Sequence, residues 1–259
     1  MPFLLVLLAS AGLAPSAHAA DAPAPPWLRA RVSGVVGSYR YEQRPSEVPG
    51  PVLPAILAVG RPLGGAAARP TGGEVDVRAW ADALGTPYVG LHARFRATGY
   101  RFAVGALETV LGDALAHGEV NLLGRVPIPI AGNQVWIGGS VGLHGDDLLL
   151  FTGCLEPGCT VLFEQLVVTG LGLGFELGAD VGRAHLVGGV DVGLASGVEP
   201  YRAAVDLESG YEFLDHVYAE VGLSMVSRSV YLQGADSLLR RGEISDDQIM
   251  VKLGIGVAL

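Results

Sequence analysis

The strongest constraint on this chain lies in its last residues, where apolar side chains recur at every second position. The odd-numbered residues from Val251 to Leu259 are all apolar. The positions between them hold Lys252, Gly254, Gly256 and Ala258. Side chains on a β-strand point alternately to the two faces of a sheet, so this segment has one apolar face and one small or polar face. The pattern predicts a strand whose two faces meet different surroundings.

Nine earlier segments alternate in a similar way and are separated by turns and longer polar connections. The ten expected strands are 27–41, 75–84, 88–102, 120–130, 135–151, 160–179, 184–195, 201–213, 217–231 and 248–259. An even number of strands places both ends of the strand array on one side, and the short connections then fall on that same side. We therefore expect an all-β fold, a single up-and-down antiparallel transmembrane β-barrel of about ten strands. Eight or twelve strands remain open.

Composition agrees with a barrel whose outside faces lipid. Half of the 259 residues are hydrophobic and 38 are glycine, and the mean hydropathy is +0.41. No segment after the N-terminal region offers the roughly 20 uninterrupted apolar residues of a spanning helix. In a membrane barrel the apolar residues face lipid, and inward glycines relieve crowding in a narrow lumen.

The N-terminus has the features of an export signal. An apolar stretch from Phe3 to Leu13 precedes Ala17-His18-Ala19, a small-x-small cleavage site. We expect residues 1–19 to be a signal peptide and 20–26 a short Pro/Ala leader. The barrel domain is then 27–259.

The C-terminal residues K-L-G-I-G-V-A-L also resemble the insertion signal of outer-membrane barrels. Its expected elements are Lys252, Gly254, Val257 and Leu259, the last replacing the usual aromatic residue. Together with the export signal and the alternation, they make the mature chain similar to the porin-like superfamily of small outer-membrane β-barrels, such as the transmembrane domain of outer-membrane protein A. The resemblance is architectural and carries no catalytic residue across. It implies a bacterial outer-membrane location and a monomer. The implied partners are outer-membrane lipid, lipopolysaccharide and the barrel-assembly machinery.

Charged residues occupy the faces that the alternation turns inward. Early strands carry Arg29, Arg31, Arg78, Arg94, Arg96 and Arg125, with Asp76 and Asp82 among them. Later strands carry Glu164, Glu176, Asp191, Asp206, Glu208, Glu212 and Glu220, with Arg202 and Arg228 among them. This separation predicts a mainly basic wall facing a mainly acidic one. We hypothesise a salt-bridge network that fills or narrows the lumen. A water-filled slit for small polar solutes and simply solvated charges are the alternatives.

Other features narrow the class of partner. A net charge of −9 argues against nucleic acid. The two cysteines, Cys154 and Cys159, fit one local disulfide in an exported chain. Two thiols alone make a poor metal site, so we expect no metal and no cofactor.

The candidate catalytic residues are not expected to lie close together in the fold. An omptin-like protease has paired acids and an Asp–His pair near its outer rim. Here Asp146-Asp147 is expected near the outer rim, but Asp215-His216 falls in a turn at the other end, and no G-x-S-x-G motif occurs. We expect a non-enzymatic structural or interaction barrel that presents loops. A narrow solute channel is the second hypothesis, and an outer-rim hydrolase is the third.

Two further expectations concern the strand ends. Aromatic residues gather near them, and we expect interfacial girdles at both edges of the apolar band. The Pro/Gly-rich segment 42–73 is expected to be irregular, either folding into the lumen or projecting outside.

Overall fold

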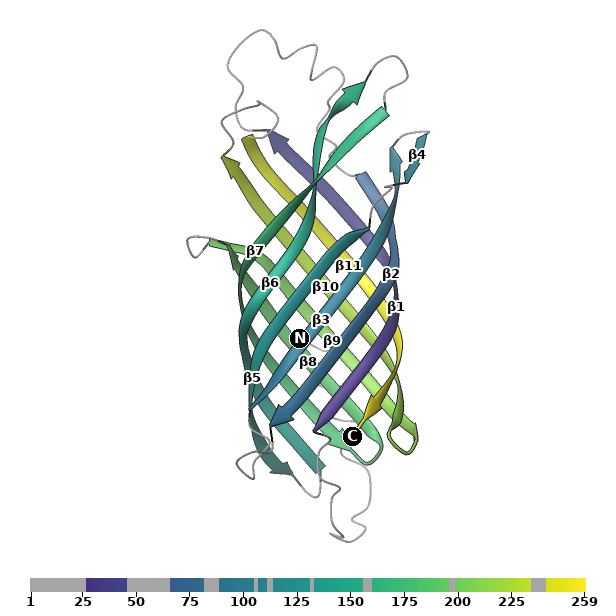
Figure 1. The fold of residues 1–259 in the computed structure, drawn as a ribbon, viewed down its shortest axis with the longest axis vertical. Coiled ribbons are helices and arrows are strands. Elements are labelled where there is room, and N and C mark those ends of the chain that lie inside the picture. Colours follow the sequence, from purple (N-terminus) through teal and green to yellow (C-terminus); the bar gives the residue numbers. More distant parts are fainter. Residues whose placement is uncertain are drawn as a thin grey trace.

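The computed structural model describes residues 27–45, 66–81, 89–104, 107–110, 114–130, 133–155, 160–195, 199–233 and 241–259. All its regular elements there are strands (Figure 1). They are β1 (Leu28–Pro45), β2 (Ala66–Ala81), β3 (Val89–Val104), β4 (Leu107–Val110), β5 (Leu115–Ile130), β6 (Asn133–Leu155), β7 (Thr160–Val181), β8 (Ala184–Ala195), β9 (Glu199–Leu214), β10 (Val217–Gln233) and β11 (Arg241–Ala258). In this part of the chain, no helix has the length and apolar character needed to cross a membrane. The expected signal peptide and leader lie outside the described residues.

Ten of these strands close into a single antiparallel barrel. Each strand pairs with its neighbours in sequence, β3 pairs with both β2 and β5, and β1 pairs with β11 to close the ring. The short β4 pairs only with one end of β3 and stands outside the ring. The all-β, up-and-down barrel of ten strands is therefore confirmed. The C-terminal strand is the closing strand, with a seam that runs from Arg29 opposite Ala258 to Pro45 opposite Gly242.

The two ends of the barrel differ in their connections. At one end, two-residue turns join β7 to β8 through Gly182-Arg183 and β9 to β10 through Asp215-His216. Gly182 and His216 have positive φ angles of 59° and 67°, as tight hairpins require. β1 begins and β11 ends at this same rim, which lies at the bottom of Figure 1. We call it the turn end and the opposite rim the loop end.

The strand alternation separates an apolar outside from a polar inside. On β3 the outward Val89, Leu91 and Phe95 are 48–59% exposed, whereas the inward Arg94 and Arg96 are 6% and 4% exposed. The other barrel strands also expose large apolar residues at alternate positions, except β2, where Val75 is the one such residue among the described side chains. An apolar band around a closed sheet, with all backbone groups paired between strands, is the architecture that β-structure needs to cross a bilayer.

Inward glycines make room for large side chains on the neighbouring strand. A Cβ on Gly178 would overlap the indole of Trp136, and one on Gly172 would overlap the imidazole of His144. His185 and Tyr218 lie in the same way over glycines of adjacent strands. The glycines thus allow a ten-stranded barrel to hold bulky inward residues.

Several strands extend further toward the loop end than the sequence predicts. β2 begins at Ala66 instead of residue 75, β11 begins at Arg241 instead of residue 248, and β5 begins at Leu115 within an expected loop. Backbone pairing continues beyond the apolar band. The alternation is lost there because both faces of those extensions meet polar surroundings.

The prediction of aromatic girdles is wrong for most of the aromatic residues whose side chains the structure describes. Six of the aromatic residues point into the lumen and are at most 5% exposed: Tyr39, Tyr41, Tyr100, Trp136, Tyr201 and Tyr218. Tyr211, Phe213 and Tyr231 do face outward. The prediction used only the position of each residue along its strand, which sets its depth in the membrane. Whether a side chain faces lipid or the lumen depends instead on whether it stands at an odd or even position of the strand.

Candidate functional site

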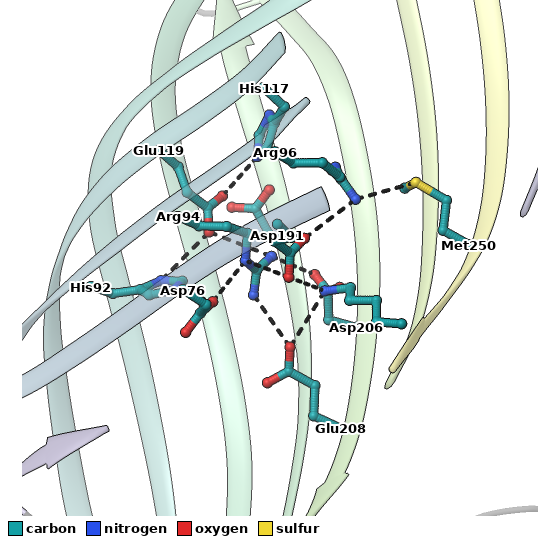
Figure 2. A network of polar contacts seen from close by, with 12 residues as sticks. Asp76, His92, Arg94, Arg96, His117, Glu119, Asp191, Asp206, Glu208 and Met250 are labelled. Carbon is teal, nitrogen blue, oxygen red and sulfur yellow. Dashed lines mark hydrogen bonds and ion pairs between the residues drawn. The ribbon is translucent and has the colours of Figure 1, made fainter. Parts of the chain in front are cut away.

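The middle of the lumen holds a group of ion pairs that we call the central cluster. Its members are Arg31, Glu74, Asp76, Arg78, Arg94, Asp206, Glu208, Glu220 and Lys252. Arg94 donates from Nε to Asp76 (2.9 Å) and from Nη1 to Asp206 (3.2 Å) (Figure 2). β3 and β9 stand five strands apart in a ring of ten. The Arg94–Asp206 pair therefore spans the full width of the lumen.

Other members of the central cluster reinforce this crossing. Glu208, also on β9, accepts hydrogen bonds from Arg31 (3.0 Å) and Arg78 (3.1 Å) on the facing wall. Lys252 of β11 lies within 3.1–3.4 Å of Asp206, Glu208 and Glu74, and it is 1% exposed. Each of these carboxylates has more than one cationic partner, which compensates for the cost of burying it.

Three acids of the central cluster, Glu74, Asp76 and Glu208, lie close enough together to hold a metal ion, with oxygens within 4.8 Å of one another. Arg31 Nη2 lies 2.9, 3.5 and 3.0 Å from these three carboxylates. The guanidinium of the chain itself therefore serves as the counter-ion of this triad.

The turn end of the lumen is crossed by a second diametric pair. Arg29 of β1 donates to Asp180 of β7 (2.7 Å), and these strands are also five apart in the ring. Nearby, the guanidinium carbon of Arg125 lies 3.8 Å from the ring centroid of Trp80 and 5.6 Å from that of Trp136. This geometry is that of a cation–π interaction.

A further group, which we call the loop-end cluster, surrounds Asp146 of β6. Its carboxylate is 1% exposed and accepts hydrogen bonds from Arg228 (3.0 Å) and Tyr201 (2.9 Å). The imidazole of His117 also lies 2.9 Å from it. Arg228 donates in addition to Asp246 (2.8 Å). Strands β5, β6, β9, β10 and β11 are thereby tied together near the loop end.

Alternating carboxylates and imidazoles join the two clusters. Asp76 contacts His92 (2.8 Å), and His92 contacts Glu119 (3.5 Å). Glu119 in turn contacts His117 (3.4 Å), which contacts Asp146 (2.9 Å). Figure 2 shows His92, Glu119 and His117 on neighbouring strands beside Arg94. The polar network is therefore continuous from the middle of the barrel to its loop end.

One small cavity lies beside this network. A cavity of about 60 Å³ lies between the central cluster and the β7–β8 wall, and Arg94, Glu176 and Asp191 are among its lining residues. This is room for only a few water molecules.

The structure places most of the sequence-predicted lumen residues inside the barrel. Arg31, Arg78, Arg94, Asp206, Glu208 and Glu220 meet in the central cluster. Arg29, Arg96, Arg125, Glu176 and Asp191 lie around it. Glu212 stays apart at the turn end, where its carboxylate accepts the His216 backbone N–H (2.8 Å). The side chains of Glu164 and Cys154, and the whole of Cys159, lie outside the described residues. The disulfide therefore stays a prediction.

Sequence reasoning did not single out several members of the network. Glu74, Glu119, Asp146, Asp246 and Lys252 were not proposed as lumen charges. Strand parity could have found Glu74, because it lies two residues before Asp76. Glu74 and Glu119 also weaken the predicted separation of sign, because they add acids to Asp76 among the arginines of the early strands. Ion pairs between neighbouring strands and ion pairs across the lumen therefore belong to the same network.

The residue pairs considered for hydrolysis lie far apart. Asp146 is buried within the loop-end cluster, with Asp147 beside it in the sequence. Asp215 and His216 form the β9–β10 turn at the opposite end, where His216 Nδ1 lies 2.9 Å from a backbone carbonyl. The structure does not bring these two pairs together.

No family model matches the sequence, and no curated protein matches it either. Solved structures of outer-membrane barrels are similar in shape. The outer membrane protease OmpT from Escherichia coli is 11% identical with a TM-score of 0.40, covering 90% of this chain and 96% of its own. The translocator domain of the autotransporter NalP from Neisseria meningitidis is 14% identical, with a TM-score of 0.41, and the match covers 100% of this chain and 95% of that domain. An outer membrane channel from Pseudomonas putida F1 is 9% identical, with a TM-score of 0.38, and the match covers 94% of this chain and 100% of the channel. These likenesses concern the barrel shape alone.

Proposed function

We propose that this protein is an integral barrel of the bacterial outer membrane with a structural or surface-interaction role, and that side chains close its lumen. The observation that carries the proposal is the pair of diametric contacts, Arg94–Asp206 within the central cluster and Arg29–Asp180 at the turn end. A conducting barrel needs a continuous aqueous path, and buried ion pairs across its full width obstruct one.

The location follows from physical requirements of the fold. A closed sheet with an apolar outer band is stable only where that band is covered by lipid, and closed barrels of this kind are typical of outer membranes. The loop end then faces outside and presents the longer connections. We propose a monomer whose partners are lipid, lipopolysaccharide and, during assembly, the barrel-assembly machinery, with no enzymatic role.

Planar-bilayer recording of the purified, folded protein tests the closed lumen. We expect no steady single-channel openings across a range of voltages. The matched comparison is a triple variant, Arg94→Ala/Glu208→Ala/Lys252→Ala, which removes both signs from the centre of the barrel and is expected to conduct. Steady openings in the wild type would favour the narrow solute channel instead.

Fractionation of cell envelopes tests the location independently. We expect the protein in the outer-membrane fraction, with a heat-dependent shift in electrophoretic mobility that marks a folded barrel. Recovery in a soluble fraction would contradict the location.

A further inference from the structure

The two imidazoles that join the central cluster to the loop-end cluster have a carboxylate at each of their ring nitrogens. His92 Nε2 lies 2.8 Å from Asp76, and its Nδ1 lies 3.5 Å from Glu119. His117 Nδ1 lies 2.9 Å from Asp146, and its Nε2 lies 3.4 Å from the other oxygen of Glu119. Glu119 thus lies between the two rings (Figure 2), and all three side chains are buried. We call His92, Glu119 and His117 the histidine bridge.

The geometry of the histidine bridge fits the protonated form of both rings. A neutral imidazole has one N–H, whereas an imidazolium has two. An ionised carboxylate only accepts hydrogen bonds, so the shorter contacts with Asp76 and Asp146 place an N–H on the nitrogens that face them. A second proton lets each ring also donate to Glu119. Without it, a lone pair of each ring faces the buried Glu119 carboxylate, and acceptors that face only acceptors are destabilising.

The other two lumen histidines of the described strands are satisfied as neutral rings. His144 Nδ1 accepts from Arg202 (3.0 Å), so its Nε2 carries the hydrogen that faces Asp191 (3.5 Å). His185 uses one nitrogen, Nε2, for its contact with Glu220 (3.1 Å). A single N–H meets the carboxylate contacts in both places. The need for a second proton is therefore specific to the two rings of the histidine bridge.

The surrounding charges permit this second proton. The charged and titratable groups that face the histidine bridge, directly or through one of its partners, are Asp76, Arg78, Arg94, Arg96, His144, Asp146, Asp191, Tyr201, Arg202, Asp206, Glu208 and Arg228. Arg78 and Arg96 stand opposite the two rings in the sheet register and disfavour a further positive charge. Each of these arginines has another carboxylate, because Glu208 lies 3.1 Å from Arg78 and Glu74 lies 3.7 Å from Arg96. The carboxylates that contact the rings directly therefore dominate.

Loss of the second protons would part the histidine bridge at Glu119. Each neutral ring keeps its shorter hydrogen bond, to Asp76 in the central cluster or to Asp146 in the loop-end cluster. Glu119 keeps its contact with Arg94 (3.5 Å). Each piece thus stays with its own strands, while the chain of contacts between the two clusters is interrupted. Imidazole is the side chain whose charge ordinarily changes between about pH 5 and 8.

We propose that the histidine bridge is a pH-sensitive latch, which ties the middle of the lumen to its loop end while both rings are protonated and releases the loop end when they lose their second protons. The sign follows from the geometry. Protons that only the folded arrangement engages with carboxylates stabilise the barrel at acid pH, and this contribution is lost as the pH rises. A barrel in the outer membrane meets the external pH at its loop end, a setting that rests on the proposed location.

Urea unfolding in phosphatidylcholine vesicles, measured from about pH 5 to about pH 9, tests the latch. We expect the folding equilibrium constant of the wild type to fall at least about tenfold across this range. His92→Gln/His117→Gln should lose most of this dependence, because its amides donate and accept at every pH. Glu119→Gln should lose it as well, because the amide removes the charge that the lone pairs would face. The control His185→Gln removes a lumen histidine with one carboxylate contact and should keep the wild-type dependence.

Nitrogen-15 NMR of the ring nitrogens reports protonation independently of stability. We expect His92 and His117 to carry two protons each at the acid end of the range and to lose the second ones as the unfolding curve shifts. Neutral rings at both positions throughout, or equal pH dependence of the wild type and the double histidine variant, would overturn the inference. A barrel whose stability ignores pH and that still conducts no ions overturns the latch alone. Steady openings at every pH would instead overturn the proposed closed lumen.

Discussion

Cutting the contact between Arg94 and Asp206 should measure how strongly the two walls of the barrel are tied together. Arg94→Met removes a guanidinium that lies 2.9 Å from Asp76 and 3.2 Å from Asp206, both largely buried. Removing one partner of a buried ion pair costs about 3–5 kcal/mol. Asp206→Asn should cost less, because Arg94 keeps Asp76. If the two residues interact directly, the double variant should recover about 1–3 kcal/mol relative to the sum of the single variants.

The free energy of unfolding can be obtained from urea titration of the barrel in lipid vesicles, followed by tryptophan fluorescence. Lys252→Met provides a matched comparison, because Lys252 also contacts Asp206 (3.1 Å) but reaches it from β11. Costs below about 0.5 kcal/mol for both single variants, as at exposed ion pairs, would refute the buried cross-lumen network. Strict additivity in the double variant would refute the direct contact.

Three other outcomes follow from local geometry. Gly178→Val should destabilise the barrel by at least about 1–3 kcal/mol, because its side chain overlaps the Trp136 ring; a stability equal to that of the wild type in urea would refute this packing. Cys154 and Cys159 should resist alkylation until a reductant is added, and two freely alkylated thiols in the native protein would rule out the disulfide. Arg125→Leu should cost about 1–2 kcal/mol and shift the tryptophan emission, because its guanidinium lies 3.8 Å from the ring centroid of Trp80 and 5.6 Å from that of Trp136; an unchanged spectrum would exclude these contacts.

The architecture could be predicted from the sequence because the apolar band imposes period-two alternation on each strand that crosses it. The same alternation identified Arg94 and Asp206 as inward residues. It did not identify which partners meet, because contacts across a lumen join strands that lie far apart in the sequence. Their meeting depends on the register of all ten strands and on the width of the closed ring.

The loop end was less predictable for a physical reason. His117 and Glu119 connect the central and loop-end clusters, yet they lie in or beside a segment that was expected to be a loop. Beyond the apolar band both faces of a strand meet polar surroundings, so the pattern fades although backbone pairing continues. The inward tyrosines, such as Tyr201, were assigned to an interface for a related reason, since depth alone does not determine the face.

Accessibility of a cysteine placed in the lumen tests the closed barrel most directly. Ser224 of β10 points inward and is 1% exposed. In a Cys154→Ser/Cys159→Ser background, Ser224→Cys should not react with a charged, water-soluble thiol reagent in the folded state, whereas Asp215→Cys in the exposed turn should react rapidly. Reaction of both cysteines at similar rates would show that water and solutes reach the middle of the barrel, and would contradict a lumen closed by side chains.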